Sequence, residues 1–194
     1  MSGKSYYKIV SVLRQIGLNF DSLSPEEAAL SESRVIITTK EEARIIGKSN
    51  LLFDTDIHRY PSIFKARIIK NLGLNHEANL LVIGIDPGNR IGIFAFYRNY
   101  ELDSTVCNSI DSAVNIVVNF LYSIESNEKL VRIGDGNPSV ANTIVKEIKR
   151  RFGNSIRIEI VNEYGTSRYA VSNSSWRKDQ DSAKKIALRV GRTI

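Results

Sequence analysis

An uninterrupted apolar run that ends in an acid, a proline and a glycine is the most constraining feature of this chain. Residues 80–85 (LLVIGI) predict a strand buried on both faces, because neither face carries a polar side chain. Asp86 stands at the carboxyl end of this strand, and Pro87-Gly88 suits a tight turn. A second apolar strand over residues 91–97 completes a hairpin. Asp86 is then either a metal ligand at a strand tip or a turn residue that bonds nearby backbone amides.

Composition bounds the class of protein. The 194 residues suffice for one large domain or two small ones, and 42% hydrophobic with 25% charged residues is ordinary for a soluble globular protein. No apolar run reaches the roughly 18 residues of a membrane span, and the first residues lack the apolar core of a signal peptide. The single cysteine, Cys107, excludes an internal disulfide, and no Cys/His cluster suggests zinc. We therefore expect a cytoplasmic protein with no membrane partner.

The net charge of +6 is unevenly distributed along the chain. Residues 1–78 carry a net charge of +2, residues 79–128 carry −4, and residues 129–194 carry +8. A basic carboxyl-terminal third beside an acidic segment suits a protein that binds a polyanion and holds cations close to it. The same count also arises when Lys and Arg only solvate helix faces.

The pattern of elements predicts two domains, a small α/β domain over residues 1–78 and a larger one over residues 79–194. The polar, aperiodic segment 73–79 marks the boundary. In the first domain we expect helices at 5–16, 40–46 and 62–72 and strands at 34–39 and 51–53.

The order of helices and strands is easier to predict in the second domain than in the first. We expect strands at 80–86, 91–98, 100–107, 129–135 and 155–163, and helices at 111–125, from 137 onward, and at 179–190. Asp111 is placed to cap the first of these helices. In the last strand, isoleucines alternate with Arg157 and Glu159, which predicts that both charged side chains face away from the core.

Acids stand where three of these strands end and where the last helix begins. They are Asp86, Asp135 and Glu163 on the strands, with Asp179 and Asp181 on the helix. In an open α/β sheet ligands gather at the carboxyl ends of the strands, so these acids converge if the strands are parallel neighbours. Converging carboxylates without histidine or thiol favour Mg²⁺ or Mn²⁺, and two such ions can support phosphodiester hydrolysis. Taken singly, each acid is equally well explained as a cap.

The order strand-strand-strand-helix-strand-helix-strand-helix is that of the ribonuclease H-like fold, and the motifs resemble its Holliday-junction-resolvase branch. Residues 83–96 (IGIDPGNRIGIFAF) are similar to the opening hairpin of RuvC-type resolvases and of YqgF-type nucleases, which trim ribosomal RNA precursors. Residues 161–167 (VNEYGTS) resemble the YqgF segment with the catalytic glutamate. Residues 179–188 (DQDSAKKIAL) resemble the final helix of both types, which starts with a catalytic aspartate.

The resemblance implies catalytic and metal-binding roles for four acids. Asp86 matches the first metal ligand, Glu163 the catalytic glutamate, and Asp179 the helix aspartate, while Asp135 sits where the RuvC type keeps its fourth-strand acid. The chain departs from the YqgF pattern at Tyr164, where the family has arginine, and in the loop after the fourth strand. Sugar kinases and actin-like ATPases open with a similar hairpin, but they need two such domains and a longer chain.

Asp179 and Asp181 compete for the role of metal ligand on the last helix. On a helical wheel Asp179 shares the face of the apolar stripe formed by Ala183, Ile186, Ala187 and Val190, whereas Asp181 points away from it. We therefore predict Asp179 as the ligand and keep Asp181 as the second candidate. An N-cap role is the alternative for Asp179.

Basic and aromatic residues flank the predicted site. Arg168, Arg177 and Lys178 surround Trp176 in the expected loop before the last helix, and Arg90 lies in the hairpin turn. Such interleaving suits phosphate contacts combined with base stacking. Alternatively, Trp176 packs the last helix onto the sheet and Arg90 is a solvated turn residue.

The sequence thus predicts a ribonuclease H-like mixed sheet flanked by helices and preceded by a small α/β domain. The expected function is that of a metal-dependent nuclease acting on branched DNA or structured RNA. The alternative is a non-catalytic nucleic-acid-binding module with the same fold. The retained acids favour the enzyme, whereas Tyr164 and the altered fourth-strand loop favour the binding module. Whether the chain forms a homodimer, as RuvC-type resolvases do, stays open.

Overall fold

The computed structural model describes residues 2–57, 59–163 and 175–194 of the chain. These residues form two compact units, Met1–His76 and Glu77–Ile194, so the division falls two residues before the predicted boundary. None of the helices in the described residues is long and apolar enough to cross a membrane.

The first unit is a small α/β layer. Its helices are α1 (Gly3–Gln15), α2 (Pro25–Leu30), α3 (Lys40–Ile46) and α4 (Pro61–Asn71), and its parallel strands are β1 (Ile36–Thr38) and β2 (Leu51–Phe53). Buried residues of α1, β2 and α4, among them Leu13, Leu52 and Phe64, pack into one apolar cluster. Ala28, Ile36 and Ile46 form a second one between α2, β1 and α3. This unit therefore has its own core.

The second unit is built on a six-stranded mixed sheet with the order β5-β4-β3-β6-β7-β8. The strands are β3 (Leu80–Pro87), β4 (Ile91–Tyr97), β5 (Tyr100–Cys107), β6 (Glu128–Gly134), β7 (Arg157–Val161) and β8 (Arg192–Thr193). β3, β4 and β5 form an antiparallel meander, whereas β6 runs parallel to both β3 and β7. The carboxyl ends of β3, β6 and β7 therefore lie together at one edge of the sheet.

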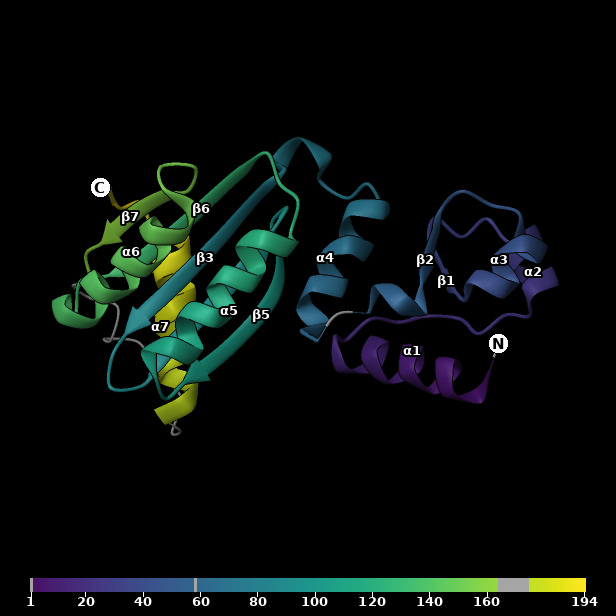
Figure 1. Cartoon of the computed structure of the whole chain (residues 1–194), viewed down its shortest axis with the longest axis horizontal. Helices are drawn as coiled ribbons and strands as arrows, with labels where there is room; N and C mark the ends of the chain where they lie inside the picture. Colours follow the sequence, from purple (N-terminus) through teal and green to yellow (C-terminus); the bar gives the residue numbers. More distant parts are fainter. Residues whose placement is uncertain (1, 58, 164–174) are drawn as a thin grey trace. The chain divides into compact units, whose positions relative to one another are not determined.

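Helices cover both faces of this sheet, as Figure 1 shows. α5 (Ile110–Ser123) and α6 (Pro138–Phe152) pack together on one face, and α7 (Ser175–Leu188) crosses β3, β4, β5 and β6 on the other. Successive side chains of β3 point to opposite faces of the sheet, which explains why helices cover both faces. Leu81, Ile83 and Ile85 are fully buried beneath α5 and α6. The intervening residues of β3 then face α7.

Several details differ from the sequence predictions, which also do not include α2 and β8. α5 is capped by the Ser109 side chain, which accepts the Ser112 N–H at 3.2 Å, and Asp111 lies inside the first turn. α7 begins at Ser175, so Asp179 is not at its start, and it ends before Val190, whose side chain is 84% exposed.

A further difference concerns Glu159, whose side chain is buried and not outward-facing. It accepts hydrogen bonds from Arg132 Nε at 2.9 Å, from Arg157, and from the Gly191 N–H at 3.2 Å. Arg132 also donates to the Ala187 carbonyl at 2.7 Å. Burial raises the pKa of Glu159, but these hydrogen bonds outweigh it and hold the pKa below its usual range. The buried pair ties the end of α7 to β6 and β7.

Candidate active site

Asp86 points toward α7 from the carboxyl end of β3. It pairs with Gly92 in the β3–β4 register, and the same face carries Val82, Phe94 and Phe96, which pack against α7. The side chain of Asp86 is half-buried and hydrogen-bonds to Ser182 of α7. The apolar strand and its tight turn thus place one carboxylate between the sheet and the helix.

Small residues allow α7 to lie directly on the sheet at this point. A Cβ at Gly84 would overlap the Ala183 carbonyl and stand 2.6 Å from the Cβ of Ala187. A Cβ at Gly92 would overlap the carbonyl of Asp179. The close approach needs glycine on the strands, and it brings the second turn of α7 beside Asp86.

Like charge and burial perturb the protonation of Asp86. Burial is the main cause that raises its pKa to about 7, and repulsion from Glu163 and Asp179 adds to it, while the Ser182 hydrogen bond acts in the opposite direction. Carboxylates from three separate elements therefore lie close enough to interact. Such perturbed acids are typical of functional sites, although structural clusters produce them too.

Asp135 and Glu163 form a second, interlocked pair at the ends of β6 and β7. The Glu163 N–H donates to the Asp135 carboxylate at 3.0 Å, and the Gly136 N–H donates to the Glu163 carboxylate at 3.0 Å. Burial raises the pKa of Glu163, which the Gly136 hydrogen bond opposes and the Asp135 charge reinforces. A Cβ at Gly134 would overlap the Glu163 carboxylate, so this side chain lies against the backbone at the end of β6.

On α7 the two candidate aspartates differ as their spacing predicts. Asp179 is partly buried, with its side chain 21% exposed, and forms an ion pair with Arg90 at 2.8 Å between Oδ2 and Nη2. Asp181 is exposed on the outer side of the helix. The geometry brings Asp179, and not Asp181, to the side of the helix that faces Asp86 and Glu163.

Arg90 and Trp176 lie at the rim of this acidic cluster. Trp176, Arg177 and Lys178 are exposed in the first turn of α7, so they do not belong to a loop as expected. Trp176 is 49% exposed and therefore does not pack α7 onto the sheet; the Arg90 guanidinium lies 5.8 Å from the centre of its ring. Arg168 lies outside the described residues.

Sequence analysis missed the residues that hold the acids in place. Ser182 hydrogen-bonds to Asp86, Gly134 and Gly136 make room for Glu163, and the Gln180 side-chain amide donates to the Ser104 carbonyl at 2.9 Å. The available signal was the Gly-Asp-Gly triplet at 134–136, since glycines flanking an acid indicate a close approach of another group.

The donor set suits a hard divalent cation in its chemistry. Carboxylate oxygens are the ligands that Mg²⁺ and Mn²⁺ prefer, and a bound cation would relieve the repulsion that Asp86 experiences. Within residues 2–57, 59–163 and 175–194, however, no three Asp, Glu, His or Cys side chains are placed as a metal-binding group. Asp179 is engaged by Arg90 and Glu163 by the Gly136 amide. A cation at this site would have to compete with those partners.

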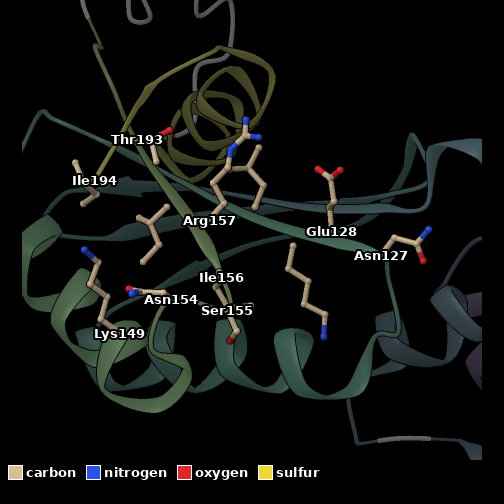
Figure 2. A pocket seen from close by; sticks show the side chains of 12 residues that line it. Asn127, Glu128, Lys149, Asn154, Ser155, Ile156, Arg157, Thr193 and Ile194 are labelled. Atoms are coloured by element: carbon tan, nitrogen blue, oxygen red, sulfur yellow. The ribbon is translucent and has the colours of Figure 1, made fainter.

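A pocket of about 560 Å³ lies at the opposite ends of the same strands (Figure 2). Figure 2 shows Arg157 and Glu128 pointing to one side of the strands, while Lys149 and Asn154 lie beside α6 on the other. These side chains do not converge on a common point. The acidic edge is therefore the better candidate for chemistry.

Comparison with known proteins does not add to this picture. No protein-family model matches the chain, and no curated protein is recognisably similar in sequence.

Proposed function

We propose that this chain is a metal-dependent nuclease of ribonuclease H-like fold that hydrolyses phosphodiester bonds in branched DNA or structured RNA. The observation that carries the proposal is the clustering of Asp86, Glu163 and Asp179, which come from β3, the end of β7 and α7 and interact electrostatically. The mixed sheet, with an antiparallel meander beside parallel strands, supports the proposed fold.

The acids of the proposed site share the role of metal ligand. Asp86, Glu163 and Asp179 would hold Mg²⁺ or Mn²⁺, with Asp135 as a further ligand. When bound, two such ions supply activation of the attacking water and stabilisation of the leaving oxygen. Asp135 also orients Glu163 through the Glu163 N–H, and Ser182 orients Asp86.

The rim residues would bind the nucleic acid. Arg177 and Lys178 are exposed beside Trp176 at the start of α7, where they can contact phosphates while the indole stacks on a base. Arg90 lies at the same rim, against Trp176. Arg168 is proposed for the same surface from the sequence alone.

A cleavage assay with paired variants tests the proposal. The full-length protein is incubated with a four-way DNA junction or a structured RNA in Mg²⁺, in Mn²⁺ or in chelator. We expect cleavage only with metal, and we expect Asp86→Asn and Asp179→Asn to abolish it, because each removes a ligand charge with little change in volume. Asp181→Asn is the matched control on the same helix and keeps most of the activity, because Asp181 is exposed.

Asp179 and Asp181 lie on different faces of α7, so reversed activities of these two variants would mean that α7 presents a different face to the site. Full activity of Asp86→Asn, or an inactive Asp181→Asn beside an active Asp179→Asn, would contradict the assigned ligands.

A non-catalytic nucleic-acid-binding module is the second candidate. Two observations favour it: no three acids in the described part of the chain are placed as a metal-binding group, and Asp179 is paired with Arg90. In that case the protein retards branched DNA or structured RNA in a gel equally well in chelator and in Mg²⁺, and never cleaves either. The same assay therefore separates the two functions.

A further inference from the structure

Arg90 is engaged on two sides at the rim of the acidic cluster. Its guanidinium forms the 2.8 Å ion pair with Asp179 and lies 5.8 Å from the centre of the Trp176 ring. The side chains of Arg90 and Asp179 are 31% and 21% exposed, whereas the Oδ2 atom of Asp179 that faces Arg90 is itself buried. A residue of the β3–β4 turn thus reaches the helix that carries the last acid.

This ion pair uses the oxygen that a metal ion would need. The carboxylate of Asp179 lies close enough to Asp86 to raise the pKa of that group, and Arg90 supplies a compensating positive charge on Asp179. Asp179 Oδ2 accepts no hydrogen bond from the described residues, but the Arg90 guanidinium lies 2.8 Å from it as an ion pair and occupies the space that a cation on this oxygen would need. Arg90 and a divalent ion are therefore alternatives at this position.

We propose that Arg90 is a built-in competitor of the metal: it neutralises Asp179 in the metal-free protein and leaves that carboxylate when a divalent cation binds. The inference rests on the proposed function, because it assumes that Asp179 is a metal ligand. The contact with Arg90 balances the charge of the buried Asp179 Oδ2 but leaves that oxygen without a hydrogen bond in the described part of the chain, so a divalent ion that coordinates it can displace Arg90. Metal binding then also changes the contact between Arg90 and Trp176.

Calorimetry on the full-length protein without nucleic acid tests the competition. MnCl₂ is titrated into the wild type and into Arg90→Gln, which keeps polarity and removes the charge. We expect Arg90→Gln to bind Mn²⁺ about three- to tenfold more tightly, because a nearby positive charge and a competing partner are both removed. Arg150→Gln is the matched control, since it removes the same charge from the exposed last turn of α6, away from the acidic cluster, and its affinity stays close to that of the wild type.

A conservative variant guards against loss of folding. Far-UV circular dichroism establishes whether each variant is folded, and if Arg90→Gln is not, Arg90→Lys takes its place. Lysine keeps the charge but cannot form the planar, forked contact of arginine. Its Mn²⁺ affinity is expected to lie above that of the wild type and below that of a folded Arg90→Gln.

Fluorescence provides an independent readout because Trp176 is the only tryptophan of the chain. Titration of the wild type with MgCl₂ is expected to change the indole emission in a saturable manner, as Arg90 moves relative to the ring. In Arg90→Gln the change is expected to be much smaller, although Mg²⁺ binds at least as well.

The outcomes separate the inference from the function on which it rests. Equal Mn²⁺ affinities of the wild type and the Arg90 variants would overturn the competition while leaving the metal site standing. Binding by Arg90→Gln but not by the wild type would support the competition in its strongest form. Absence of Mn²⁺ binding in every variant would overturn the inference together with the proposed metal-dependent activity.

Discussion

Asp86 keeps its proton to a higher pH than an ordinary aspartate, because it is half-buried and faces two other carboxylates. Its pKa in the folded protein is about 7, whereas an unfolded chain holds aspartate near the usual value of about 4. At pH values between these two pKa values, the folded state binds more protons than the unfolded state. The free energy of unfolding therefore decreases as the pH rises through this window, and the loss is complete above the folded-state pKa.

Removal of this charge is expected to stabilise the metal-free protein at high pH. We expect Asp86→Asn to increase the free energy of unfolding by about 1–3 kcal/mol at pH 8, a range that allows for screening of the charge by solvent. At pH 5 the increase should be much smaller, because Asp86 is then mostly protonated in the folded protein. Urea denaturation in chelator at both pH values measures the difference. Asp181→Asn serves as the control, because it removes a carboxylate from the exposed side of α7. If Asp86→Asn increases the free energy of unfolding equally at both pH values, the surroundings of Asp86 do not disfavour its ionised form.

At the scale of elements, the position of α7 decides which acids can meet. Glycines on β3 and β4 let the helix backbone approach the sheet, and small residues of α7 complete the contact. The buried Arg132–Glu159 pair holds the other end of the helix. The helix therefore has a fixed register, which places Asp179 toward the carboxyl end of β3.

A single methyl group is expected to disturb this packing. Gly84→Ala places a Cβ against the backbone of Ala183 and Ala187, which cannot move without the whole helix. We expect a loss of about 1–3 kcal/mol in the free energy of unfolding, as for other overpacked cores. Thermal and urea unfolding measure it, and Gly3→Ala is the control, because nothing lies within 4 Å of its added Cβ. A fully stable Gly84→Ala would mean that α7 does not sit directly on β3.

Elements that bury a periodic apolar face could be predicted from the sequence, and those that do not could not. The hairpin over residues 80–97 and the apolar face of α7 are seen in the structure. The first turn of α7 was missed because Trp176 and its neighbours are exposed and leave no hydrophobic periodicity. Glu159 was misplaced because its burial depends on Gly191 and Arg132, which arrive from other parts of the chain.

The same distinction applies to the candidate site. The ends of the strands could be predicted from the sequence. Asp86 and Asp135 could therefore be placed at the carboxyl ends of two strands before the structure was known. The ion pair between Arg90 and Asp179 depends on the exact approach of a turn to a helix, which no local pattern encodes. Helical spacing alone predicts that Asp179 lies on the inner side of the helix and Asp181 on the outer side, and the structure shows this arrangement, whereas the role of Asp179 as a metal ligand stays a prediction.

At the scale of the whole molecule, basic residues occur at both ends of the strands of the second unit. Arg177 and Lys178 lie in the first turn of α7 near the acidic edge, whereas Lys149 and Arg150 end α6, which runs away from that edge. Only the first pair belongs to the proposed nucleic-acid surface. A count of charges along the sequence does not separate the two groups.

Salt dependence should reveal which group binds nucleic acid. With about four phosphate contacts, the affinity for branched DNA is expected to fall roughly 100-fold between about 50 and 200 mM salt, because bound counterions are released. The double variant Arg177→Gln, Lys178→Gln should reduce the slope of log affinity against log salt concentration by about two, because two phosphate contacts are lost. The double variant Lys149→Gln, Arg150→Gln is the matched control and should leave it unchanged. Electrophoretic mobility shifts in chelator measure both, and a flat response of the wild type would argue against a polyanion partner.

The second unit is expected to fold and to bind metal without the first. Every acid of the proposed site lies between Asp86 and Asp181, and the sheet with its three helices lies within Glu77–Ile194. Such a segment is well above the roughly 60 residues at which single domains become marginal. A fragment of residues 77–194 should therefore unfold cooperatively and bind Mn²⁺ with the affinity of the full chain, as measured by circular dichroism and calorimetry. The fragment with Asp179→Asn is the control for specific binding. A folded fragment that no longer binds Mn²⁺, while the full chain does, would show that residues 1–76 contribute to the site.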